Sequence, residues 1–194
     1  MKILIFGSNG FIGSTLSDRF QKTGNEVLRV SRDVLNFGTG GEDIKIRALL
    51  EQFEPDVIVN AIGEIDIMNK STPQAMFDSL LLPSASLYRH FQQFSSSRNI
   101  EVLTFGSEAE GLPRTRYPIY AALKTAEASL IKSATESFAN TPITWHRVRL
   151  PRLNGGLGIE SSDKTPILES SRDRVWSDVI EVLGINYYTL ERDE

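Results

Sequence analysis

KILIFGSNGFIG, residues 2–13, joins an apolar run to three glycines that stand three positions apart. The apolar run predicts a buried strand, and the residues from Phe11 onward have the spacing of a helix. Glycine lets the backbone turn tightly and approach a pyrophosphate, which the N–H groups and the dipole of a helix N-terminus attract. Because the glycines lie between the first strand and a helix, the pattern predicts a dinucleotide-binding turn. The alternative is an ordinary strand-to-helix turn.

Tyr120 and Lys124 stand four residues apart in a segment with a helical pattern, so they share one helix face. A lysine ammonium beside a phenol favours the phenolate, so we expect a lowered pKa for Tyr120, which suits a proton donor to a carbonyl. Ser107 follows the apolar run 100–105 and can polarise the same carbonyl from a strand end. The alternative is structural: a buried tyrosine, a surface lysine and a serine that caps a helix.

With these motifs the sequence resembles the short-chain dehydrogenase/reductase superfamily, and within it the extended branch of NAD-dependent epimerases and dehydratases that act on nucleotide sugars. It looks most similar to the dTDP-4-dehydrorhamnose reductase type, in residues 1–7 and 54–61. The resemblance covers residues 1–180 and implies a Rossmann-like fold. It assigns catalysis to Ser107, Tyr120 and Lys124.

The resemblance also assigns residues to cofactor binding. The glycine turn supplies Gly7, Ser8, Asn9, Gly10, Phe11, Ile12 and Gly13. Asp43 and Ile44 resemble a pair that contacts adenine. A further segment beside the cofactor is formed by Asn60, Ala61, Ile62 and Gly63. Tyr120 and Lys124 are expected to contact the cofactor as well as the substrate.

The end of the predicted second strand bears on the choice of cofactor. A carboxylate at this place bonds the ribose 2′-hydroxyl of NAD and repels a 2′-phosphate. Ser31 stands there instead and Arg32 follows, so NADP is favoured over NAD. Asp33 keeps NAD open, because a shift of register brings its carboxylate to the ribose. A second basic cluster is interpreted as a pyrophosphate contact or as solvated charges on an edge strand: Arg147, Arg149 and Arg152.

The composition of the 194 residues excludes several classes of protein. A net charge of −4 without a run of basic residues argues against a nucleic-acid surface. The absence of cysteine excludes disulfides and thiolate chemistry, and two separated histidines give no metal-site spacing, so we expect catalysis without a metal. No apolar run is long enough for a membrane span, which predicts a cytoplasmic protein.

Short β-rich runs alternate with amphipathic segments, which predicts an α/β fold: a doubly wound parallel sheet with helices on both faces. We expect strands at 2–6, 26–30, 56–61, 100–105 and 143–149, and helices at 11–22, 42–53, 74–96 and 117–138. The whole chain, 1–194, is interpreted as one domain with a reduced C-terminal substrate lobe. The loop-rich stretch 151–175 is a candidate substrate lid or a plain surface connection. The family resemblance implies a homodimer that pairs through the helices at 74–96 and 117–138.

Together with the family resemblance, these features predict an NADP-dependent ketoreductase. The resemblance implies that its substrate is a nucleotide-linked keto-sugar of surface polysaccharide or deoxysugar biosynthesis. Two alternatives stay open. One is a nucleotide-sugar epimerase or dehydratase that keeps NAD bound, for which Glu108 offers a single carboxylate beside the serine. The other is a non-catalytic NADP-sensing protein.

Overall fold

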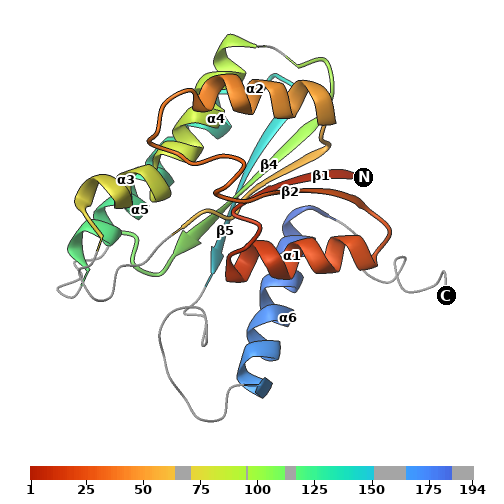
Figure 1. Cartoon of the computed structure of the whole chain (residues 1–194), viewed down its shortest axis with the longest axis vertical. Coiled ribbons are helices and arrows are strands. Elements are labelled where there is room, and N and C mark those ends of the chain that lie inside the picture. The colour runs from red at the N-terminus through yellow and green to blue at the C-terminus, as the bar shows by residue number, and fades with distance from the viewer. Residues whose placement is uncertain (64–70, 95, 112–116, 151–164, 185–194) are drawn as a thin grey trace.

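The computed structural model describes residues 1–63, 71–94, 96–111, 117–150 and 165–184. Within these residues the centre is a five-stranded parallel sheet in the order β2-β1-β3-β4-β5 (Figure 1). The strands are β1 (Lys2–Phe6), β2 (Glu26–Val30), β3 (Val57–Asn60), β4 (Ile100–Ser107) and β5 (Ile143–Leu150). The chain runs outward from β1 to β2 on one side and to β3 on the other. This reversal leaves a crevice at the carboxyl ends of the strands, where doubly wound sheets bind ligands.

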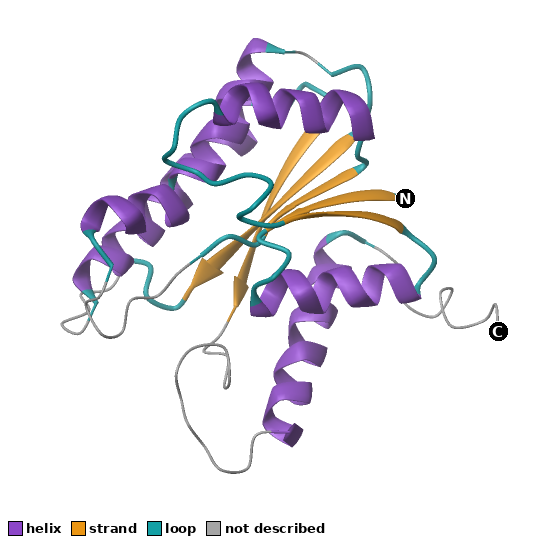
Figure 2. Cartoon of the chain, in the orientation of Figure 1, coloured by secondary structure: helices purple, strands orange, loops and turns teal. Residues whose placement is uncertain are grey.

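Helices cover both faces of the sheet. They are α1 (Phe11–Lys22), α2 (Glu42–Phe53), α3 (Pro73–Leu80), α4 (Leu82–Gln93), α5 (Pro118–Ser137) and α6 (Thr165–Val182). In Figures 1 and 2, α1 and α6 lie on one face, and α2, α4 and α5 lie on the other. One core lies under each set: Phe20 packs edge-on against Trp176 at 4.9 Å between ring centroids, and Phe138 stacks on Trp145 at 6.2 Å. The expected doubly wound α/β fold is confirmed.

The expected element bounds agree with the structure to within about two residues, except over residues 74–96. That segment is wrong as one helix, because α3 ends at Leu80 and α4 begins at Leu82. Pro83 explains the break. It lacks an N–H group, and its ring clashes with the carbonyl four residues earlier inside a helix. Both features are tolerated in the first turn of a helix, where Pro83 lies in α4.

The stretch 151–175 is described only from residue 165 onward. Residues 165–175 belong to α6, and residues 151–164 of the expected lid lie outside the described residues. Val175, Trp176, Val179 and Ile180 are buried in one core cluster with side chains of the sheet. α6 is therefore part of the core rather than a loop. None of the described helices is long and apolar enough to cross a membrane.

Candidate active site

The glycine turn between β1 and α1 is shaped by close backbone contacts. Gly7 has a φ of 74°, and a Cβ at this position would lie 2.8 Å from the carbonyl oxygen of Ala61. A Cβ on Gly13 would lie 2.2 Å from the carbonyl oxygen of Gly7. Only glycine therefore lets the first turn of α1 pack this closely against the end of β1.

The same turn carries hydrogen-bond donors that fit an anion. Gly10 is the N-cap of α1, and no side chain accepts a hydrogen bond at this helix end. Ser8 is 2% exposed, and its hydroxyl has no hydrogen-bond partner among the described residues. An uncapped helix N-terminus and a spare buried hydroxyl are donors that a pyrophosphate can use. The residues present therefore fit a bound dinucleotide.

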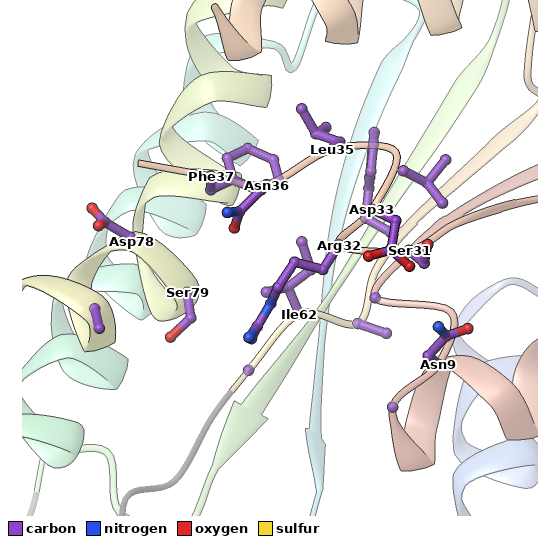
Figure 3. Close-up of a pocket in the computed structure, with 17 residues that line it drawn as sticks. Asn9, Ser31, Arg32, Asp33, Leu35, Asn36, Phe37, Ile62, Asp78 and Ser79 are labelled. Carbon is purple, nitrogen blue, oxygen red and sulfur yellow. The ribbon is translucent and has the colours of Figure 1, made fainter. Parts of the chain in front are cut away.

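A cavity of about 460 Å³ lies beside this turn, at the carboxyl ends of β1 and β2 (Figure 3). Its size is in the range of small-molecule sites. Gly7, Asn9 and Gly10 line it from the turn. Phe11 and Ile12, which were also expected at the cofactor, pack against the core under α1 instead.

The end of β2 reaches the cavity through Ser31, Arg32 and Asp33. Arg32 points across the cavity toward α3, where Ser79 lies (Figure 3). Asp33 and Asp78 add carboxylates to the same lining, so both signs of charge border the space. In the described part of the chain, no group of three or more histidine, cysteine, aspartate or glutamate side chains could hold a metal ion.

Asp43 and Ile44, expected at the adenine, lie away from the cavity. Asp43 is in the first turn of α2 and pairs with Arg89, and Ile44 is 76% exposed. Asn36 and Phe37 line the cavity instead, because the loop after β2 crosses the strand ends before α2 begins. Sequence reasoning missed this pair. The signal in the sequence is an apolar residue, Phe37, in the loop between the second strand and the next helix.

The segment after β3 forms the opposite wall of the cavity with Ala61, Ile62 and Gly63. Asn60 is buried behind this wall. Its amide donates to the hydroxyl of Ser84 at 3.0 Å, and its side-chain oxygen accepts from the N–H of Ile62 at 3.3 Å. Asn60 therefore shapes the segment and does not line the cavity.

Ser107 ends β4, and Tyr120 lies in the first turn of α5. Burial raises the pKa of Tyr120, and the Ser107 hydroxyl, which neighbours the phenol, opposes that rise. The expected lowering of the Tyr120 pKa is wrong, because burial dominates and the ammonium of Lys124 is paired with Glu127. The phenol is therefore protonated throughout the neutral range, in the form that can donate a proton.

Lys124 lies one turn after Tyr120 and is 5% exposed. Its Nζ donates to the carbonyl oxygen of Phe105 at 2.6 Å and to Oε2 of Glu127. Burial lowers the pKa of Lys124, and the Glu127 carboxylate opposes this decrease. Because Phe105 lies two residues before Ser107 on β4, the structure brings Ser107, Tyr120 and Lys124 together at one strand end.

Helix α3 connects this strand end to the cavity. Asp78 and Ser79 of α3 line the cavity, while Met76 and Leu80 share a buried cluster with Tyr120. The glycine turn and the Ser107–Tyr120 pair therefore border one region at the carboxyl edge of the sheet.

Glu127, Glu110 and Arg147 are charged residues of this region that sequence reasoning did not assign to it. Arg147, interpreted as a pyrophosphate contact or a solvated charge, lies 2.6 Å from Glu110 and 3.2 Å from Glu127. The signal for Glu127 is its spacing of three residues from Lys124 on one helix face. No sequence signal links Arg147 to α5, since β5 meets that helix only in the folded sheet.

Comparisons with known proteins agree with this geometry. The model of a family described as NAD dependent epimerase/dehydratase matches residues 3–151, which include the glycine turn, Ser107, Tyr120 and Lys124. No curated protein matches the chain. A short-chain dehydrogenase/reductase from Vibrio parahaemolyticus has a similar structure, with 17% identity, a TM-score of 0.70 and 90% of each chain covered.

Two further solved structures share the fold. The 3-alpha-hydroxysteroid dehydrogenase from Pseudomonas sp. B-0831, complexed with NADH, has 16% identity and a TM-score of 0.70, with 99% of this chain and 91% of that chain covered. A dTDP-4-dehydrorhamnose reductase from Bacillus anthracis, in complex with NADP, has 12% identity and a TM-score of 0.61. That comparison covers 81% of this chain and 55% of the other.

At these identities the solved structures show the fold, and the family model identifies the class. The resemblance to the NAD-dependent epimerase/dehydratase branch that the motifs indicated is confirmed. The chain belongs to the NAD dependent epimerase/dehydratase family.

Proposed function

We propose that the chain is an NADP-dependent ketoreductase that reduces a carbonyl of a nucleotide-linked keto-sugar. The supporting observation is the position of Ser107, Tyr120 and Lys124 at the end of β4, beside the helix that also lines the cavity. Reduction of a carbonyl needs a hydride donor, a proton donor and a group that holds the carbonyl oxygen. The last two are side chains of this protein.

NADPH, when bound, supplies the hydride that the carbonyl carbon receives. Tyr120 donates the proton to the carbonyl oxygen, and burial keeps its phenol protonated until then. The hydroxyl of Ser107 holds the same oxygen. Lys124 lies one helical turn after Tyr120 on α5, and its role in the proposal is to hold the ribose of the bound cofactor.

The preference for NADP is proposed from Ser31 and Arg32. A guanidinium at the end of β2 matches the charge and the planar bonding of a 2′-phosphate. Asp33 lines the same cavity and would favour the free 2′-hydroxyl of NAD. The choice therefore depends on which of the two side chains meets the ribose.

Titration of the purified protein with NADPH and NADH tests the proposal, because a ligand that binds only the folded state raises thermal stability. We expect NADPH to raise the melting temperature more than NADH at equal concentration. Arg32→Ala should weaken NADPH binding about tenfold or more and change NADH binding about twofold or less. Arg29→Ala is the control, since Arg29 lies three residues before Arg32, on β2, and its side chain donates to Asp18 and Gln21. Preference for NADH contradicts the cofactor assignment, and binding of neither contradicts the oxidoreductase.

The proposal of a sugar substrate is supported by the solved structure from Bacillus anthracis, which has a similar fold and is named a dTDP-4-dehydrorhamnose reductase. Net oxidation of NADPH by a 4-keto nucleotide sugar is the expected result. An epimerase or dehydratase would instead retain its cofactor through purification and give no net oxidation. A sensing protein would bind NADPH without turnover. A homodimer through α3, α4 and α5 stays a prediction, which light scattering on the purified protein can test.

A further inference from the structure

Three charged side chains surround Lys124. Lys124 and Glu127 lie on α5, Arg147 lies on β5, and Glu110 lies in the turn after β4. Lys124 is 5% exposed and Glu127 is 2% exposed, so neither charge is solvated to any useful extent. Two cations face two carboxylates here, which removes the net charge that burial would penalise. We call these four residues the buried charge group.

Glu127 is the member that joins the group to the rest of the site. Its Oε2 accepts from Nζ of Lys124 and, at 3.2 Å, from Arg147. Its Oε1 accepts from the hydroxyl of Ser84 at 2.8 Å, and Ser84 in turn accepts from Asn60 behind the cavity wall. Because both oxygens are satisfied from different directions, the carboxylate has one fixed orientation.

We infer that Glu127 is a positioning residue for Lys124, an inference that rests on the proposed role of Lys124 in catalysis. Its carboxylate and the carbonyl oxygen of Phe105 hold the ammonium of Lys124. Phe105 lies two residues before Ser107 on β4. Without this carboxylate, Lys124 and Arg147 would share the single counter-charge of Glu110. Glu127 therefore fixes both the place and the charge of the ammonium.

The groups that face Lys124 act on its protonation in opposite directions. Glu127 and Glu110 raise the pKa of Lys124, while burial and Arg147 lower it. The same two carboxylates raise the pKa of Tyr120, as does its neighbour Tyr117. Removal of the Glu127 charge therefore lowers the pKa of both Lys124 and Tyr120. Each of them then loses its proton at a lower pH.

Glu127→Gln tests the inference, because glutamine keeps the shape and an acceptor for Ser84 but carries no charge. The pKa of Lys124 can be measured by NMR of the purified protein with ¹³C at lysine Cε, with the resonance assigned by Lys124→Met. We expect this pKa to fall by about one pH unit or more in Glu127→Gln. Glu136→Gln, at an exposed position of the same helix, should leave it unchanged. An unchanged Lys124 titration in Glu127→Gln would overturn the inference.

Arg147→Met gives a second test of opposite sign, which also serves if Glu127→Gln does not fold. Loss of the guanidinium removes a positive charge near Lys124 and the second cation that pairs with Glu127. The pKa of Lys124 should therefore rise. A fall, or no change, contradicts the inference. Neither titration needs a cofactor or a substrate, so their failure is distinct from a failure to bind NADPH.

Kinetics add a readout that a purely structural role would not change. With any carbonyl compound that the wild type reduces with NADPH, Glu127→Gln should move the alkaline limb of the pH–rate profile to lower pH. Glu127→Asp restores the charge and should move the limb part of the way back. An alkaline limb that stays in place in Glu127→Gln contradicts the inference.

Discussion

Among single residues, the hydroxyl of Tyr120 has the most specific consequence for activity. Tyr120→Phe removes the phenolic hydroxyl, which is the proposed proton donor, but keeps the buried ring. Turnover should fall about 10²–10⁴-fold, since this is the usual contribution of a positioned acid, while NADPH binding stays within about twofold. Tyr117→Phe is the matched control, because that ring lies 6.0 Å from the ring of Tyr120 and has no assigned role. Equal losses in both variants would contradict the assignment of Tyr120.

Gly13 has a structural consequence that can be measured without any ligand. A methyl group at this position would lie 2.2 Å from the carbonyl oxygen of Gly7, which is backbone and cannot rotate away. Gly13→Ala should therefore lower the free energy of unfolding by about 1–3 kcal/mol, as measured in urea. Gly63→Ala is the control, because its methyl group would meet only Leu80 at 3.8 Å, an ordinary contact. A Gly13→Ala protein as stable as the wild type would contradict the close packing of the turn.

The residues that sequence could predict are those whose roles follow from spacing along the chain. Three glycines after a strand, and a tyrosine four residues before a lysine, are local patterns with one geometric meaning. The pKa of Tyr120 could not be predicted in this way, because it depends on burial and on Glu127, whose pairing with Lys124 only the folded structure reveals. The same holds for Arg147, which reaches Glu110 only after β5 has joined the sheet.

Among the elements, the starts of β1 and β3 are tied by Asp56. Its carboxylate accepts from the backbone N–H of Lys2 at 2.8 Å and from Arg98 at 2.8 Å. The pKa of Asp56 lies below the ordinary value of 3.8. The bond from the Lys2 N–H lowers it most, and Arg98 adds a smaller effect. The contribution of Asp56 to stability is therefore complete above pH 3.8 and is lost as the pH falls through the lower, folded-state pKa.

Asp56→Asn should lower the free energy of unfolding by about 1 kcal/mol at neutral pH, because charge-assisted bonds become weaker neutral ones. The difference from the wild type should shrink as the pH falls through the lowered, folded-state pKa of Asp56. Urea unfolding at neutral pH and at a series of acid pH values measures this. Asp18→Asn, in an exposed pair with Arg29, should cost about 0.5 kcal/mol or less. A difference that does not depend on pH would contradict the role of the charge.

The elements themselves were predictable where one period dominates the local sequence. The helix at 74–96 was not, since a helical pattern spans Pro83 although the backbone cannot continue through it without a break. α6 was overlooked because the glycine-rich run at 154–158 drew the interpretation of a long loop. The apolar residues Val175, Trp176, Val179 and Ile180 repeat at helical spacing, and this signal was present.

In the whole molecule, one sheet separates two cores, each of which contains a tryptophan. Trp145 on β5 lies in the core under α2, α4 and α5, and Trp176 on α6 lies in the opposite core. Alternate residues of β1 serve both: Leu4 and Phe6 face the first core, and Ile3 and Ile5 face the second. Loss of either core would therefore expose one face of the strands to water. The other core packs on the opposite face of the same strands and would lose its support.

We expect the two cores to unfold in one transition, which the two tryptophans can report separately. Trp176→Phe leaves Trp145 as the single reporter, and Trp145→Phe leaves Trp176. The indole N–H of Trp145 has no hydrogen-bond partner among the described residues, so Trp145→Phe costs packing only. In each variant, the urea midpoint from fluorescence should equal the midpoint from circular dichroism. If the signal of Trp176 changed at a lower urea concentration than the dichroism, α6 would unfold on its own. That helix would then be a separate cooperative unit.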